Sequence, residues 1–162
     1  ALRYVQKRHG PPFWALFAGD GVLRSEVERR MALENVRGVC TGFLNVDEVA
    51  QAYAAADFLV HTCDRESYGL VAVEAARMGL PMIVPASMGA IGKTDAARPG
   101  ENAWVFQDGC AEELARWIER LVSQPEERVR MSTASARIYA ELQATFEKGV
   151  EQLLKKAEEG VP

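Results

Sequence analysis

Short apolar runs alternate with amphipathic segments along most of the chain. Each run is typical of a strand in a parallel sheet, which is buried on both faces and therefore carries few polar residues. We expect such strands at 13–18, 36–43, 58–62, 82–85 and 103–106. Strands that alternate with helices in this way predict an α/β fold with a doubly wound, Rossmann-like parallel sheet.

Between these runs, apolar residues recur at intervals of three and four, which predicts helices. In the segment 70–78, Gly79 followed by Pro81 predicts that the helix ends there. Three helix starts carry a Ser or Asn followed three residues later by Glu, as in a capping box. These pairs are Ser25 with Glu28, Asn45 with Glu48, and Ser123 with Glu126.

The last segment is predicted to be helical from about residue 125 to residue 156. Its apolar residues form a near-heptad stripe, which we expect to face the core. The stripe would also suit docking on a domain outside this chain, because a terminal helix must bury its apolar face somewhere. Its members are Tyr139, Leu142, Phe146, Val150 and Leu153.

Composition limits the class of protein. The 162 residues suit a single domain, and 19 basic against 23 acidic residues give a net charge of −4, which argues against a nucleic-acid binder. No apolar run approaches the ~20 residues that a membrane helix needs. Three separate cysteines and two histidines argue against a zinc site or a disulfide framework and indicate a reducing, cytoplasmic compartment. The chain begins with helical character, so we expect a fragment of a longer protein.

In a doubly wound fold, the loops that follow the strands meet at one edge of the sheet, where ligands bind. Gly19 and Gly21 follow the first strand; such glycines let backbone amides approach an anion closely, although a tight turn explains them as well. Gly42 and Phe43 end the second strand, where their backbone would meet a nucleobase edge; packing of Phe43 is the alternative. Residues 86–101 form a Gly-rich loop that either wraps a ligand or is plain surface.

The segment 65–74, RESYGLVAVE, is the fourth loop of this kind. Glu66 precedes the helix, and the free amides of residues 69–71 would point at the ligand edge, an arrangement that binds phosphate. Glu74 lies about one turn further on, among apolar neighbours, so we expect it to need hydrogen-bond donors. A ribose diol supplies two donors; an ion pair with Arg77 is the alternative.

Glu66 and Glu74 enclose seven residues, with Tyr-Gly-Leu between them and Glu-Ala at the end. This segment is similar to the E-x7-E segment of the retaining, two-domain (GT-B-type) glycosyltransferases of group 1, or family four. Further segments agree with that family in order, so the resemblance covers about residues 13–125. They are FAGDG at 17–21, NV and the later Gly at 35–42, YAAAD at 53–57 and GLP at 79–81.

The resemblance implies that residues 1–162 are a single Rossmann-like domain, the C-terminal half of a GT-B fold. It would bind a UDP-, GDP- or ADP-linked sugar for transfer to an unknown acceptor: a polysaccharide, a lipid-linked molecule or a small molecule. The first strand, with the Arg and Lys that grip the diphosphate, and the N-terminal acceptor domain would lie outside the chain. No metal or other cofactor is expected, peripheral association with a membrane stays open, and the domain alone would be inactive.

The resemblance also implies roles for individual residues. Glu66 would contact hydroxyls of the donor sugar at the catalytic centre, and Glu74 would hold the ribose hydroxyls. Residues expected along the sugar and diphosphate are Tyr68, Gly69, Leu70 and Val71. Residues expected to line the cleft are Gly19, Gly21, Gly42 and Phe43.

Two other functions stay open. A related GT-B enzyme, such as a nucleotide-sugar epimerase, would want further acid–base residues in the cleft, where His61 is the histidine available and packing at a strand end is its simpler role. A non-catalytic Rossmann-like scaffold would make Glu66 and Glu74 dispensable for ligand binding. A phospho-receiver version of that scaffold would use Asp20 and Asp64.

Overall fold

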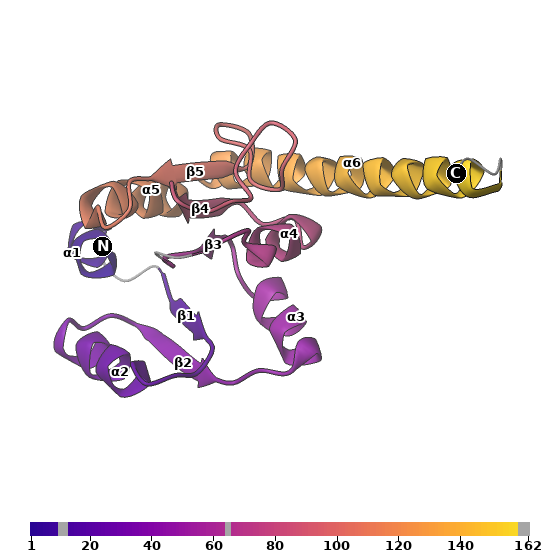
Figure 1. Cartoon of the computed structure of the whole chain (residues 1–162). Coiled ribbons are helices and arrows are strands. Elements are labelled where there is room, and N and C mark those ends of the chain that lie inside the picture. Colours follow the sequence, from indigo (N-terminus) through magenta and orange to yellow (C-terminus); the bar gives the residue numbers. More distant parts are fainter. Residues whose placement is uncertain (10–12, 64–65, 159–162) are drawn as a thin grey trace.

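The computed structural model describes residues 1–9, 13–63 and 66–158 (Figure 1). Strands and helices alternate as far as the fourth strand, after which a fifth strand and two consecutive helices follow. Every strand pair in these ranges is parallel, which confirms the predicted α/β class. The strands are β1 (Ala15–Ala18), β2 (Gly38–Gly42), β3 (Leu59–Val60), β4 (Met82–Pro85) and β5 (Ala103–Phe106). The helices are α1 (Leu2–His9), α2 (Arg24–Leu33), α3 (Val46–Ala54), α4 (Leu70–Arg77), α5 (Ala111–Ser123) and α6 (Pro125–Glu158).

The strands form two sheets instead of one continuous sheet. β1 pairs with β2, while β4 lies between β3 and β5. Figure 1 shows β1 on the side of its sheet nearer to β3, but the two strands do not pair. β1 and β3 are therefore both end strands in the part of the chain that the structure describes.

Burial is uneven between the two sheets. Every residue of β4 is buried, and the two core clusters join β4 to residues of α1, α4, α5 and α6. Between residues 13 and 60, Gly42 is the one buried residue. Leu16 and its partner Val39 are exposed on the face of the β1–β2 sheet. The prediction of a fully buried strand at 13–18 is therefore wrong, because that face of the small sheet is uncovered.

Of the three predicted capping boxes, the one at Asn45 is present and the two at Ser25 and Ser123 are not. The Asn45 side chain accepts hydrogen bonds from the second and third amides of α3 at 3.0 Å, and Glu48 accepts from the Asn45 amide at 2.8 Å. Ser25 lies inside the first turn of α2, and Ser123 is the last residue of α5. Neither serine is the residue directly before a helix, so neither can form the predicted box.

α6 runs well past the sheets (Figure 1). Tyr139 and Leu142 pack against the core, as predicted for the apolar stripe. Phe146, Val150 and Leu153 are exposed, the first of them by 71%. The prediction that these three residues face the core is wrong, because the helix extends beyond the elements on which it packs. No helix in the described ranges has the length and apolarity to span a membrane.

A buried polar network fastens the loop before β5 to α6. The Ser135 hydroxyl donates to the Leu80 carbonyl at 2.6 Å and accepts from the Asn102 amide at 3.2 Å. Asn102 also donates to the Ala96 carbonyl and accepts from the Arg98 amide. Both side chains are fully buried, and buried polar groups of this kind are costly to leave unpaired.

Replacing Ser135 by alanine is expected to lower the free energy of unfolding by about 1–3 kcal/mol, because a buried carbonyl and amide lose their partner. Ser123→Ala, the same change at an exposed hydroxyl, is the control and is expected to cost less than about 0.5 kcal/mol. Urea unfolding of both variants measures the difference. Equal stability of the two variants would contradict the role of the network.

Candidate functional site

The start of α4 holds the Glu66 carboxylate. Glu66 Oε1 accepts hydrogen bonds from the backbone amides of Gly69 at 3.1 Å and Tyr68 at 3.4 Å. Its other oxygen lies 3.9 Å from His61 Nε2, at the carboxyl end of β3. Two of the residues expected along the donor therefore bind Glu66 through their amides, and the carboxylate occupies the place predicted for an anion.

Two glycines allow this loop to pack closely against the loop after β4. Gly69 has a φ of +97°, and a Cβ there would lie 2.7 Å from Met88 Sδ. A Cβ at Gly89 would overlap the carbonyl oxygen of Ser67. The turn at residues 67–69 and the loop after β4 are thus in close contact at two points.

Leu70 and Val71 are the first two residues of α4, so their amides have no carbonyl partner within the helix. The Leu70 side chain is 67% exposed and Tyr68 is about half exposed, whereas Val71 is half-buried. The helix start therefore offers free amides beside exposed apolar side chains. This is the arrangement predicted for a phosphate group.

Glu74 is exposed, contrary to the prediction that it is buried among apolar neighbours. α4 buries its alanine face instead, and Glu74 lies off that face. The Tyr53 hydroxyl donates to Glu74 Oε2 at 2.8 Å, and Arg77 is not the partner. Burial, and then the hydrogen bond to Glu74, raises the pKa of Tyr53, so the hydroxyl stays protonated and orients the carboxylate. The YAAAD segment contained this residue, but its contact with Glu74 was not predicted.

His61 is half-buried, and its Nε2 has no hydrogen-bond partner in the described part of the chain. Burial lowers the pKa of His61, and the nearby Glu66 carboxylate opposes that change. The imidazole is therefore mostly neutral at pH 7. Asp64 and Arg65, which the sequence analysis also named, lie outside the described residues.

The loops after β1 and β2 meet. The Gly19 amide donates to the Gly42 carbonyl at 3.1 Å, and both glycines have positive φ. Gly19 and Gly21 line a surface cavity of about 370 Å³. Its described lining includes neither Gly42 nor Phe43, which is 81% exposed. The structure thus brings the three predicted glycines together.

Arg24 lines the same cavity and was not predicted from the sequence. Its guanidinium would lie 2.6 Å from a Cβ at Gly42, and it lies 3.7 Å from Asp20 and 3.0 Å from Glu28. The hydrogen bond to Glu28 is the main cause that raises the pKa of Arg24. Arg24, the first residue of α2, therefore stays charged, and the carboxylates of Asp20 and Glu28 both lie within ion-pair distance of it.

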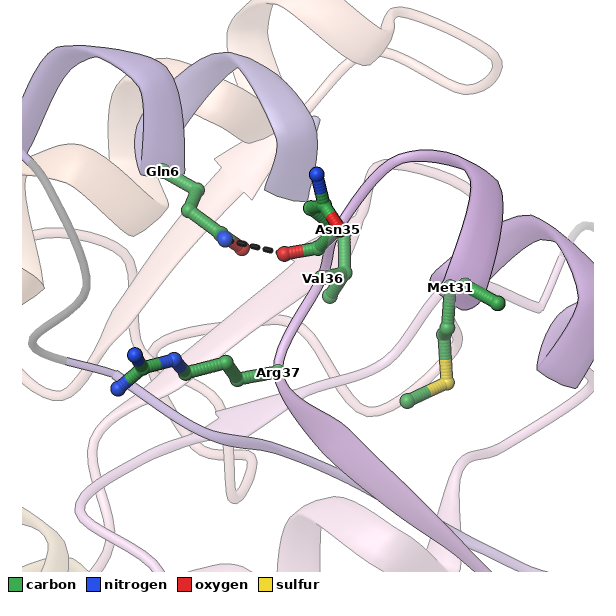
Figure 2. A pocket seen from close by; sticks show the side chains of 6 residues that line it. Gln6, Met31, Asn35, Val36 and Arg37 are labelled. Atoms are coloured by element: carbon green, nitrogen blue, oxygen red, sulfur yellow. Dashed lines mark hydrogen bonds between the residues drawn. The ribbon is translucent and has the colours of Figure 1, made fainter.

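A second cavity, of about 390 Å³, lies between α1 and the turn that leads into β2 (Figure 2). Figure 2 shows Gln6 donating to the Asn35 carbonyl across this cavity, with Arg37 nearby. These residues are at the amino end of β2, whereas the predicted residues lie at the carboxyl ends of the strands. This cavity is therefore separate from the candidate site.

Residues 1–137 match the family model described as "Glycosyl transferases group 1". The match covers most of the chain, so the chain belongs to this family. Over 112 residues it is 30% identical to the sulfoquinovosyl transferase SQD2 of Arabidopsis thaliana, and over 118 residues it is 33% identical to a 2-deoxystreptamine glucosyltransferase of Streptomyces kanamyceticus. These matches cover 69% and 72% of this chain but only 22% and 30% of the relatives.

Solved structures confirm the fold. The Anabaena protein HepE, crystallised with UDP, matches with a TM-score of 0.78 at 21% identity, over 96% of this chain and 44% of HepE. The C-terminal domain of a group 1 family protein, LpcC from Francisella tularensis, matches with a TM-score of 0.64 at 14% identity. That match covers 86% of this chain and 91% of the domain. The fold is therefore that of the C-terminal half of a GT-B protein.

Gly89→Ala is expected to displace Ser67 and weaken the hydrogen bonds from Tyr68 and Gly69 to Glu66, because a Cβ has no room there. Gly21→Ala is the matched control, since it adds a Cβ in open space without a positive φ. Amide chemical shifts of Tyr68 and Gly69 are expected to move in the first variant and stay in place in the second. Unchanged shifts in Gly89→Ala would contradict the close packing of the two loops.

Proposed function

We propose that this chain is the donor-binding half of a retaining glycosyltransferase that moves a sugar from a nucleoside diphosphate to an acceptor. The observation that carries the proposal is the placement of two carboxylates around one helix start. Glu66 is bound by the amide of Gly69, the residue directly before α4, and Glu74 is held by Tyr53 about one turn into the same helix. Family membership and the GT-B half-fold support the same function.

The geometry suggests how the donor binds. Glu74 accepts hydrogen bonds from the ribose hydroxyls while Tyr53 keeps its carboxylate oriented. The diphosphate takes the amides at the start of α4, where the helix dipole stabilises negative charge. Glu66 then faces the hydroxyls of the transferred sugar. Stabilising the departing diphosphate by amides and cationic side chains lowers the barrier without a metal ion.

The base and the acceptor are separate questions. HepE has been crystallised with UDP and with UDP-glucose, which makes UDP the first nucleotide to test. Another relative, 36% identical over 70 residues, is a GDP-mannose-dependent mannosyltransferase of Mycobacterium tuberculosis, so GDP is the second. The relatives differ in acceptor, and the acceptor domain proposed for the whole protein is not part of this chain.

We also propose that a parallel strand from elsewhere in the whole protein lies between β1 and β3. Both are end strands, and Gly42 is the one buried residue in the range 13–60. α1 directly precedes β1 and packs against α5. In doubly wound folds, a helix in that position normally follows a strand parallel to the next one. Such a strand would join the two sheets into one.

Glu74→Gln is expected to lower the affinity for both UDP and UDP-glucose by about tenfold, because a charged acceptor of the ribose hydroxyls is lost. Glu66→Gln is expected to lower the affinity for UDP-glucose alone, since UDP lacks the sugar. Calorimetry measures both, with GDP and ADP compounds alongside.

Glu151→Gln on the exposed end of α6 is the control for both variants and is expected to change neither affinity. Equal binding by all three variants would contradict the donor site and favour a scaffold. The same result is to be checked in a longer polypeptide, because cationic groups outside this chain are expected to contribute.

Some backbone amides of Ala15–Ala18 and Leu59–Val60 point away from the strand that each pairs with in the present sheets. In a polypeptide that contains the proposed extra strand, these amides are expected to exchange with solvent at least about tenfold more slowly than in this chain, because they gain hydrogen bonds. Met82–Pro85, which is already central in its sheet, is the internal control. Hydrogen exchange followed by mass spectrometry compares the two polypeptides. Unchanged exchange at both strands would contradict the inserted strand.

A further inference from the structure

We propose that His61, Cys63 and Glu66 form a binding site for a divalent transition-metal ion such as Zn²⁺. The three residues each offer one ligand atom, and these atoms all lie within 4.8 Å of one another. The separation of His61 Nε2 and Glu66 Oε2 is 3.9 Å. No metal site was expected from the sequence, and the fold brings these three side chains together.

The chemistry of the three ligands suits zinc. An imidazole nitrogen, a thiolate sulfur and a carboxylate oxygen are the atoms that Zn²⁺ prefers. Metal–ligand distances of about 2.0–2.3 Å place tetrahedral ligands about 3.3–3.7 Å apart. The His61–Glu66 separation is close to this range, and small side-chain rotations would bring Cys63 to it. Three protein ligands leave a fourth position for water or a ligand.

An unsatisfied atom supports the same site independently. His61 Nε2 is buried and has no hydrogen-bond partner among residues 1–9, 13–63 and 66–158, although buried polar atoms are nearly always satisfied. The distance of 3.9 Å to Glu66 is too long for a hydrogen bond. A metal ion between the two side chains would supply the missing partner of the nitrogen.

The backbone holds two of the ligands in place. The His61 amide donates to the Ile83 carbonyl at 2.9 Å, which continues the pairing of β3 with β4. Glu66 is fixed through its other oxygen by the Gly69 amide. Cys63 lies between these two residues in the sequence, and it is half-buried. His61 and Glu66 would therefore already be in position when the metal binds.

The metal and the sugar donor would compete, because both need Glu66. This consequence rests on the proposed function, whereas the metal site itself does not. Competition of this kind is reciprocal: Zn²⁺ would weaken donor binding by the same factor as the donor weakens Zn²⁺ binding.

Cobalt titration of the reduced chain tests the site directly. Co²⁺ bound by a thiolate gives a charge-transfer absorption in the near ultraviolet, which Zn²⁺ should abolish by displacement. We expect this absorption in the unchanged chain and in Cys110→Ser, the control thiol. Cys63→Ser should lose it, and His61→Gln should weaken Co²⁺ binding at least about tenfold. Circular dichroism establishes that each variant is folded, and His61→Gln keeps the test decisive if Cys63→Ser does not fold.

Absence of the absorption, or its persistence in Cys63→Ser, would overturn the site. UDP-glucose binding is then measured with and without Zn²⁺ in the unchanged chain and in Cys63→Ser. Weaker binding with Zn²⁺ in the unchanged chain alone would support the competition. Equal binding would overturn the competition, while the cobalt spectrum still decides the metal site. Failure of the proposed function would appear separately, as no donor binding in the absence of metal.

Discussion

The start of α4 is the constraint around which the candidate site is built. A helix that begins at the ends of buried strands exposes amides that have no carbonyl partner in the helix. Glu66 accepts hydrogen bonds from the amides of Tyr68 and Gly69, which directly precede the helix, and Gly69 and Gly89 let the neighbouring loop pack closely against this turn. The carboxylate is therefore positioned by the fold itself. Its neighbour Glu74 is positioned in turn by the Tyr53 hydroxyl.

The two sides of the site differ in how firmly they are held. Residues around Glu66 and Glu74 rest on β3, β4 and α4, next to the buried core clusters. The loops that carry Gly19 and Gly42 belong to the small β1–β2 sheet, which has almost no buried residues. Local opening costs least where few apolar contacts are buried. The glycine loops are thus the more adaptable part of the site, and they would gain rigidity from any strand that joins the two sheets.

The elements that the sequence predicted best are those whose signals are local. Met82–Pro85 and Ala103–Phe106 match the predicted strands, since continuous apolar runs between Gly and Pro punctuation leave little choice. The Asn45 cap was equally local. The division into two sheets was not predictable, because it depends on which distant strands pair. The partner of Glu74 lies 21 residues away on α3, and no periodicity within one helix indicates it.

The site residues divide in the same way. Glu66, Gly69 and Glu74 share one segment, so a motif could identify them. Arg24 is part of the site only because the loops after β1 and β2 meet. The spacing of His61, Cys63 and Glu66 in the sequence matches no standard zinc motif. The end of β3 and the turn before α4 bring those three side chains together. Long-range packing, which sequence patterns report poorly, is thus what completes the site.

Glu66 shows why one carboxylate can serve structure and ligand at once. Its Oε1 accepts hydrogen bonds from the amides of Tyr68 and Gly69. These two hydrogen bonds would survive ligand binding if the diphosphate binds to the amides of Leu70 and Val71. Its Oε2 points toward His61 without a hydrogen bond and is the atom left for a sugar hydroxyl or a metal ion. In the two proposals, both ligands would meet the same oxygen and would therefore exclude each other for a geometric reason. The charge of Glu66 would matter to both proposed ligands, whereas its contact with the backbone amides needs only an acceptor, which the side-chain oxygen of glutamine also provides.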